Sequence, residues 1–131
     1  MVIDTSAILG ILLAEADASR YAQAIEAAPE RKMSAASLLE AAIVIDNRGD
    51  ALASREFDLF ISRAGIEVEP VTFEQVRIAR AAYRDFGKGR HPAGLNFGDC
   101  FAYALAKTLD QPLLFKGADF AMTDVRIADA V

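Results

Sequence analysis

The stretch VIDTSAIL at residues 2–9 decides the fold. Val2 and Ile3 are adjacent apolar residues, typical of a short buried strand, and Asp4 follows them directly. Apolar residues then dominate Ser6–Leu13, which predicts a helix immediately after the acid. A strand that ends at an acid and leads into a helix is the opening unit of an alternating α/β protein.

The same alternation continues along the rest of the chain. Short apolar segments predict strands at residues 32–33, 66–70 and 112–115. Periodic apolar residues predict helices at residues 17–28, 35–47, 51–64, 73–86 and 97–109, with Ser34 and Thr72 as N-caps. The helix after Thr72 carries an apolar stripe, formed by Phe73, Val76, Ala79, Tyr83 and Phe86. This pattern predicts an α/β fold in which helices cover both faces of a mainly parallel sheet.

The length and composition fit a single domain spanning residues 1–131. A chain of 131 residues that is 53% hydrophobic can bury a core and is too apolar to stay disordered. Its single cysteine, Cys100, excludes an internal disulfide and a cysteine-rich zinc site. No apolar stretch is long enough to span a membrane, and Asp4 stands too early for a secretory signal. We therefore expect a soluble, cytoplasmic protein with no membrane partner.

Charge is distributed unevenly along the chain. The net charge of −5, from 14 Lys and Arg against 19 Asp and Glu, argues by itself against binding to nucleic-acid phosphates. Residues 76–118, however, hold seven cationic side chains and three acids, a local balance of +4, which leaves −9 for the remainder. A basic segment within an acidic chain indicates two surfaces with different tasks.

Four of the acids occupy positions where a carboxylate can do chemistry. In an open parallel sheet, ligands bind at the carboxyl ends of the strands. Asp4 follows the first predicted strand, and Asp119 follows the last one. Glu40 lies on a helix among apolar neighbours, where an unpaired charge is costly. Asp99 stands three residues after Asn96, close to the start of a helix.

Each of these acids also has an ordinary structural role. Asp4 can cap the helix that follows it, and Asp119 can be a turn residue. Glu40 can extend from the flank of its helix into water. Asp99 can form a capping box with the preceding asparagine. Gly98 weakens the first turn of that helix, and the close approach of another group would explain its presence.

As a set, the four acids predict a divalent metal site. If they converge at one end of the sheet, their charges repel one another and cannot all persist without a cation. Oxygen ligands without a Cys or His cluster favour Mg²⁺ or Mn²⁺ over zinc. Such a site suits the hydrolysis of phosphodiester bonds, because a bound metal ion activates water.

Four segments of the chain, in order, resemble the PIN-domain family and specifically the VapC toxins of bacterial toxin–antitoxin pairs. They are VIDTSAIL at 2–9, SLLEAAIV at 37–44, LNFGDCFAYALA at 95–106 and LLFKGADFAMTDV at 113–125. The resemblance implies a three-layer α/β/α sandwich and an endoribonuclease that depends on Mg²⁺ or Mn²⁺. By this resemblance the catalytic and metal-binding residues are Asp4, Glu40, Asp99 and Asp119, with Ser6 as the small hydroxyl residue and Asp124 as an acid found in many members.

The same resemblance implies three partners. They are an RNA substrate, a second copy of the chain in a homodimer, and a cognate VapB-type antitoxin. The antitoxin's carboxy-terminal segment would cover the active site and often bring an arginine among the carboxylates. The apolar candidates for the antitoxin groove are Ile8, Leu9, Ile11, Leu12, Leu13 and the helices at 35–47 and 51–64.

A series of basic residues predicts where RNA binds. Three arginines share one face of a helix at spacings of three and four residues, and the series continues into the loop GKGRHPAG at 87–94. The predicted RNA-binding residues are Arg77, Arg80, Arg84, Lys88, Arg90 and His91. They can follow a phosphate backbone toward the acids, or they can form an ordinary solvated face with Glu74 and Asp85 as partial partners.

Three other interpretations fit parts of the pattern. A receiver-like phospho-signalling module has a similar length, and Lys116 suits its late lysine, but Asp4 has no acidic neighbour and Asp58 lies inside a helical segment. A phosphatase of the haloacid-dehalogenase type needs an acid where Ser6 stands. A catalytically silent PIN domain that only binds RNA is the third, although the set of acids is intact.

Overall fold

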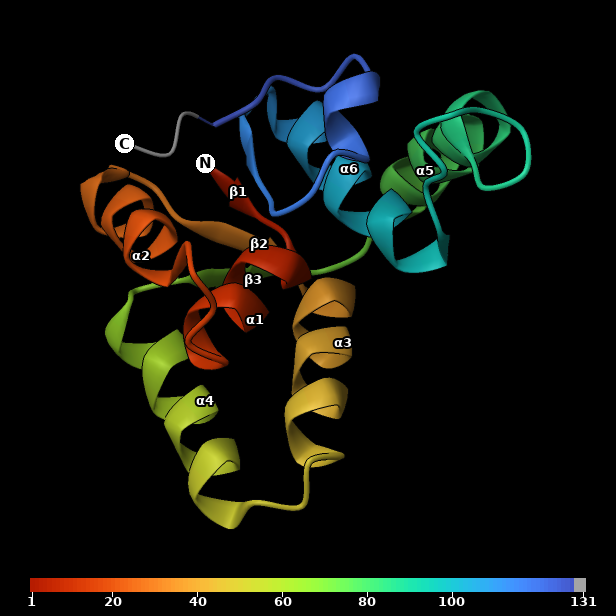
Figure 1. Cartoon of the computed structure of the whole chain (residues 1–131). Helices are drawn as coiled ribbons and strands as arrows, with labels where there is room; N and C mark the ends of the chain where they lie inside the picture. The colour runs from red at the N-terminus through yellow and green to blue at the C-terminus, as the bar shows by residue number, and fades with distance from the viewer. Residues whose placement is uncertain (129–131) are drawn as a thin grey trace.

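Four short parallel strands form the centre of the molecule in the computed structural model, which describes residues 1–128 (Figure 1). Across the sheet their order is β3 (Glu67–Glu69), β2 (Lys32–Ser34), β1 (Val2–Ile3) and β4 (Leu113–Leu114). Val2 pairs with Lys32 on one side and with Leu113 on the other. This sheet confirms the predicted α/β class, while residues 129–131 of the expected domain lie outside the described part of the chain.

Within residues 1–128, six α-helices connect and cover the strands, and their bounds agree with the sequence prediction to within one residue. They are α1 (Thr5–Leu12), α2 (Ala18–Ala27), α3 (Ala35–Asp46), α4 (Ala51–Arg63), α5 (Phe73–Phe86) and α6 (Phe97–Leu109). A 3₁₀ turn, η1 (Phe120–Met122), follows β4 and was not predicted.

Side-chain caps explain why these helices begin where they do. The hydroxyl of Ser34 accepts a hydrogen bond from the Ala36 N–H at the start of α3, and the hydroxyl of Thr72 accepts one from the Gln75 N–H at the start of α5. Each bond satisfies a backbone donor that has no partner inside the helix. Both predicted caps are confirmed.

The sheet separates two apolar cores, as the alternation of side chains along a strand requires. Ile3 and Leu114 lie in the core formed with helices α1 to α4. Val2 and Leu113 lie in the core formed with α5 and α6. The predicted three-layer arrangement is therefore confirmed: helices cover both faces of the sheet.

One end of this sheet gathers the segments that matter for chemistry. Because the strands are parallel, their carboxyl ends share one edge of the sheet. α3 begins directly after β2, so its first turns start at this edge. α6 leads into β4 and runs against the strand direction, so its first turn lies there as well.

The apolar stripe of α5 is only partly buried, with Ala79 and Phe86 packed against the core that α5 shares with α6. Phe73, Val76 and Tyr83 are 78%, 45% and 40% exposed, respectively. The buried Ala82 lies on the same side of α5 as Ala79 and Phe86, in the core shared with α6. Small side chains such as alanine let two helices approach closely, which leaves the large apolar residues at the margin of the contact.

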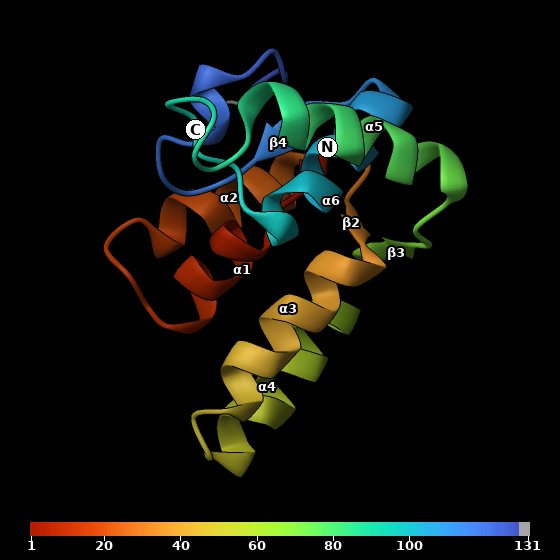
Figure 2. The ribbon, with the colours of Figure 1, turned by 90° about the vertical axis from the view of Figure 1, so that its right-hand side faces the viewer.

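α3 and α4 lie side by side and extend away from the rest of the molecule (Figures 1 and 2). Ile8 was expected among the exposed apolar residues of an antitoxin groove. It is instead fully buried, in the core that α3 and α4 share with α1 and α2. Leu9, Ile11, Leu12 and Leu13 are half-buried. None of the helices within residues 1–128 combines the length and apolar character needed to cross a membrane.

Candidate active site

Asp4 is the buried acid of the site, with 4% of its surface exposed. Its Oδ2 atom accepts hydrogen bonds from the Ser6 N–H at 3.0 Å and from the Ser6 hydroxyl at 2.6 Å. The first bond makes Asp4 the N-cap of α1, so its ordinary structural role is real. The bond from the Ser6 hydroxyl orients the carboxyl group as well.

Asp99 is held in the first turn of α6 by a capping box. The Asn96 side chain accepts a hydrogen bond from the Asp99 N–H at 2.9 Å, and Asp99 Oδ2 accepts one from the Asn96 N–H at 3.0 Å. The structural role proposed from the sequence is thus confirmed. The capping box occupies one carboxylate oxygen of Asp99, Oδ2, and thereby fixes the direction of the other oxygen.

Glu40 of α3 meets α6 at Gly98. A β-carbon added at position 98 would overlap Oε2 of Glu40 and would lie 2.8 Å from its Cδ atom, nearer than real side chains approach. Gly98 is therefore the residue that admits the Glu40 carboxylate beside Asp99. The close approach that the sequence suggested at this glycine is confirmed.

Electrostatics connects these acids. The pKa of Asp4 is raised to about 6, chiefly by burial; the Ser6 hydrogen bonds lower it, and the charges of Asp99 and Glu40 raise it. Burial also raises the pKa of Asp99, with contributions from the charges of Asp119 and Glu40. Four carboxyl groups from separate parts of the chain thus influence one another at one edge of the sheet.

Asp119 is the exposed member of this set. It lies at the start of η1, where its side chain makes no capping hydrogen bond. Across residues 1–128, no three Asp, Glu, His or Cys side chains stand close enough in this arrangement to form a ready metal-binding group. The acids therefore lie at the same edge of the sheet and influence one another's pKa, but they do not form a compact cluster of metal ligands.

Asp124 is not brought together with the other acids. It accepts hydrogen bonds from the hydroxyl of Tyr103 and from the Lys107 ammonium, the latter at 3.2 Å. Its pKa is lowered, first by the Tyr103 hydrogen bond and also by Lys107. These contacts attach the segment after η1 to the middle and end of α6.

The predicted RNA-binding residues lie mostly on the surface. All five cationic residues are exposed on α5 and the loop that follows it: Arg77, Arg80, Arg84, Lys88 and Arg90. Arg84 has a loose ion pair with Asp85 at 3.9 Å, as one of the structural alternatives anticipated. His91 is half-buried: its Nδ1 atom accepts a hydrogen bond from the Ala93 N–H, and its ring packs edge-on against Phe86.

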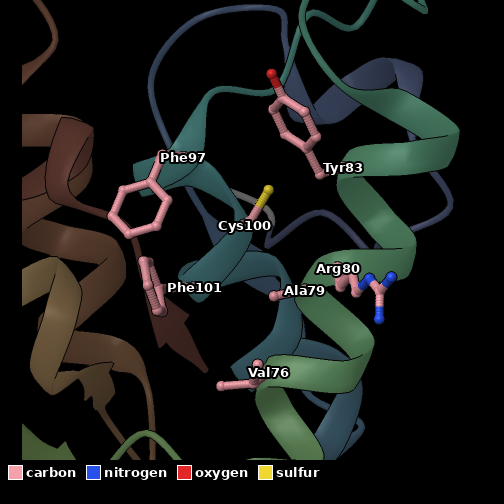
Figure 3. Close-up of a pocket in the computed structure, with 7 residues that line it drawn as sticks. All are labelled: Val76, Ala79, Arg80, Tyr83, Phe97, Cys100 and Phe101. Carbon is pink, nitrogen blue, oxygen red and sulfur yellow. The ribbon is translucent and has the colours of Figure 1, made fainter.

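An apolar surface beside the acids extends over three helices. Exposed apolar residues were expected on the helix at 35–47, as part of an antitoxin groove, but not their continuation onto α6 and α5. A groove of about 550 Å³ lies between α5 and α6, and Figure 3 shows Phe97 and Phe101 of α6 opposite Val76 and Tyr83 of α5. A second groove of about 300 Å³ lies between α6 and α3, beside Leu39. We call this surface the Phe97 face; its exposed apolar residues are Leu39, Ile43, Val44, Val76, Tyr83 and Phe97. The sequence signal for this surface is the set of large apolar residues that remain after each helix has been assigned a buried face.

Cys100, at the floor of the larger groove, is buried as expected of a small core residue. The pKa of its thiol is raised to about 11, first by burial and also by the nearby Asp99 charge. A thiol with so high a pKa is a poor nucleophile at neutral pH.

Comparison with known proteins agrees with this geometry. The PIN domain family model matches residues 1–125. The chain is 55% identical to "VapC ribonuclease Mb0625" of Mycobacterium bovis and to "Ribonuclease VapC28" of Mycobacterium tuberculosis, over 98% of this chain and 97% of each relative. At 43% identity it also matches "Ribonuclease VapC42" of M. tuberculosis, over 98% of both chains.

Solved structures share the fold at low sequence identity. A toxin–antitoxin complex from Klebsiella pneumoniae superposes with a TM-score of 0.70 at 18% identity, over 94% of this chain and 92% of that chain. VapC20 of M. tuberculosis, a sarcin–ricin loop cleaving toxin, superposes with a TM-score of 0.73 at 18% identity, over 95% of both chains. The receiver-like and phosphatase-like interpretations are wrong, and Asp58 is an exposed residue of α4. The chain belongs to the PIN-domain family and, within it, to the VapC group.

Proposed function

We propose that the protein is an endoribonuclease toxin that depends on Mg²⁺ or Mn²⁺ and hydrolyses phosphodiester bonds of RNA. The observation that carries this proposal is the buried Asp4, whose pKa is raised to about 6 at the edge that also holds Glu40, Asp99 and Asp119. A buried carboxylate with acidic neighbours is costly unless a cation compensates it. The names of the VapC relatives, which are ribonucleases, support the reaction class.

The donor set fits a hard divalent ion. All four side chains offer carboxylate oxygens, which are the ligands of Mg²⁺ and Mn²⁺, and the buried Cys100 thiol does not compete. Asp4, Glu40, Asp99 and Asp119 would hold the ion, which when bound supplies an activated water and charge stabilisation at the phosphate. The contacts of Asp124 support a role in anchoring the end of the chain to α6 rather than a role as a ligand.

The chain's own residues prepare this site. Ser6 keeps one oxygen of Asp4 hydrogen-bonded, so that the other oxygen, Oδ1, is oriented. Asn96 does the same for Asp99. Gly98 makes room for Glu40. Placing these carboxylates on the starts of helices and the ends of strands holds them on rigid elements, as a preorganised site requires.

The basic surface of α5 would bind the RNA backbone. Arg77, Arg80 and Arg84 lie on one helix, and Lys88 and Arg90 extend the surface into the following loop. Exposed cations that release counterions from phosphates provide affinity independent of sequence. The site and the basic surface together resolve the contrast between an acidic chain and a nucleic-acid substrate.

A second copy of the chain is the partner that the Phe97 face fits best. The ridge formed by Phe97 and Phe101 lies between two grooves, so the same surface offers both a projection and the hollows to receive it. Such self-complementarity suits a twofold dimer.

A cognate VapB-type antitoxin is the proposed inhibitor. The support is membership in the VapC group and the structural likeness to a toxin–antitoxin complex. Outside the Phe97 face, the exposed Leu52 and Leu59 of α4 and the half-buried residues at the end of α1 offer apolar surface for its segment.

The function is tested by cleavage of RNA with purified protein. Total RNA is incubated with wild type, Asp4→Asn, Asp99→Asn and the exposed control Asp58→Asn, with Mg²⁺, Mn²⁺ or EDTA, and the cut sites are mapped. We expect cleavage by wild type and Asp58→Asn only, and none in EDTA. Equal cleavage by all four proteins would contradict the assignment.

A catalytically silent RNA-binding PIN domain is the second candidate. It is favoured by one observation: the acids within residues 1–128 do not form a ready three-ligand group. RNA binding without cleavage in any of the metal conditions would establish this alternative.

A further inference from the structure

A chain of hydrogen bonds ties the segment that carries Asp119 to the buried Asp4. The backbone N–H of Lys116 donates to the Ser6 hydroxyl oxygen at 2.9 Å, and that hydroxyl donates to Asp4 Oδ2 at 2.6 Å. A backbone N–H can only donate, and a hydroxyl has one proton. The Lys116 N–H therefore occupies an acceptor position of Ser6 and leaves its proton directed at Asp4.

The side chain of Lys116 connects the same segment to the end of α1. Its ammonium forms an ion pair with the Glu15 carboxylate, and both side chains are about two-thirds buried, with 38% and 35% exposed. Its stem passes over Gly10, where an added β-carbon would lie 3.9 Å from the Lys116 Cδ atom. Lys116 is thus packed over Gly10 and paired with Glu15.

Glu15 is presented by an unusual turn. Ala14, directly before it, has φ +51, a left-handed conformation that is unfavourable for alanine. The Glu15 N–H donates to the Gly10 carbonyl at 3.0 Å, which closes the end of α1. Unfavourable backbone conformations persist where the surrounding structure holds them, often near functional sites.

We propose that Glu15 and Lys116 are positioning residues of the acidic site. Their ion pair anchors Lys116, and so holds in place both its hydrogen bond to Ser6 and the segment that leads from it to Asp119. This inference rests on the proposed metal-dependent function. An ion pair near the surface contributes little to folding, so its loss should change metal affinity much more than stability.

The test is Mn²⁺ binding, measured by the loss of the free-ion signal in electron paramagnetic resonance, without RNA. The proteins are wild type, Glu15→Gln, Lys116→Met and the charge-swapped double variant Glu15→Lys/Lys116→Glu. We expect the single variants to bind Mn²⁺ about tenfold more weakly, the range typical of residues that orient metal ligands. The double variant should recover most of the affinity, because it restores the ion pair.

The matched control is Arg126→Met, which removes another ion pair, with Asp110 at the far end of α6. It should leave Mn²⁺ affinity unchanged, and thermal unfolding should show all variants folded. Unchanged affinity in the single variants, or an equal loss in Arg126→Met, would overturn the positioning role while leaving the metal site intact. If wild type binds no Mn²⁺, the metal-dependent function itself fails, and the inference fails with it.

Discussion

Gly98 packs directly against the carboxylate of Glu40, so that the first turn of α6 and the second turn of α3 meet with no side chain at position 98 to hold them apart. Position 98 therefore determines whether Glu40 can stand beside Asp99. Glycine costs the helix about 1 kcal/mol relative to alanine. This loss of helix stability accompanies an arrangement in which two acids from distant parts of the chain lie close together.

Gly98→Ala should separate stability from activity. We expect the free energy of unfolding to change by no more than about 1 kcal/mol, since better helix propensity offsets the displaced glutamate. Mn²⁺ affinity and RNA cleavage should each fall by about tenfold or more, because the added methyl group displaces Glu40, a proposed ligand. Urea unfolding, Mn²⁺ titration and a cleavage assay measure the three quantities.

Gly10→Ala is the control for that substitution. Gly10 also lies inside a helix, but its added β-carbon would meet the Tyr21 ring at 3.5 Å and the Lys116 Cδ atom at 3.9 Å, which are both ordinary contacts that require no side chain to move. Cleavage by Gly10→Ala should match that of wild type. Full activity of Gly98→Ala would show that Glu40 does not need its observed position.

The raised pKa of Asp4 predicts a stability that depends on pH. Its pKa is about 6 in the folded protein against 3.8 for an ordinary aspartate, so the folded state binds this proton more tightly. The resulting stabilisation is fully present below pH 3.8 and is lost as the pH rises through 6. The loss amounts to about 3 kcal/mol. In EDTA, Asp4→Asn should therefore be more stable than wild type at pH 8 by up to about 3 kcal/mol.

Urea unfolding at pH 4, 6 and 8 checks this prediction. The difference between Asp4→Asn and wild type should shrink toward zero at pH 4, and Mg²⁺ at pH 8 should stabilise wild type but not the variant. A wild type that is as stable as Asp4→Asn at pH 8 in EDTA would mean that the ionised Asp4 carries no cost.

Charge reversal on α5 should weaken RNA binding. The variant Arg77→Glu/Arg80→Glu/Arg84→Glu, in an Asp4→Asn background that does not cleave, should bind single-stranded RNA more weakly at low salt. The slope of log affinity against log salt should flatten by about 0.7 for each phosphate that the variant no longer neutralises. Fluorescence anisotropy at several salt concentrations measures both. Arg55→Glu/Arg63→Glu on α4 is the control, and an unchanged slope in the α5 variant would remove this surface from the RNA-binding site.

The Phe97 face should control oligomeric state. Phe97 is 78% exposed in the isolated chain, and Phe97→Asp would place a charge on the apolar ridge. We expect wild type to sediment as a dimer and Phe97→Asp as a monomer at micromolar concentrations. Leu52→Asp, on the similarly exposed Leu52 of α4, should stay dimeric. A Phe97→Asp protein that remains dimeric would place the interface elsewhere.

The sequence determined the elements of this protein because their signals are local. Ser34 and Thr72 mark helix starts through hydrogen bonds to backbone groups two or three residues away, and the helix at 97–109 was predicted to the residue. The acids were also identifiable, since strand ends and an apolar helix environment can be read from neighbouring residues. Membership in the PIN-domain family followed from the order of four such segments.

Tertiary structure alone decided which contacts form between distant segments. Nothing near Ser6 in the sequence indicates that the Lys116 N–H, 110 residues away, donates to its hydroxyl. Periodicity showed that α5 has apolar residues, but only packing against α6 decided that Ala82 is buried and Phe73 exposed. Helix periodicity fixes which residues share a face, whereas burial depends on the shape of the partner surface. For that reason the sequence was enough to identify the acids of the site, whereas the contacts that support them are seen only in the folded structure.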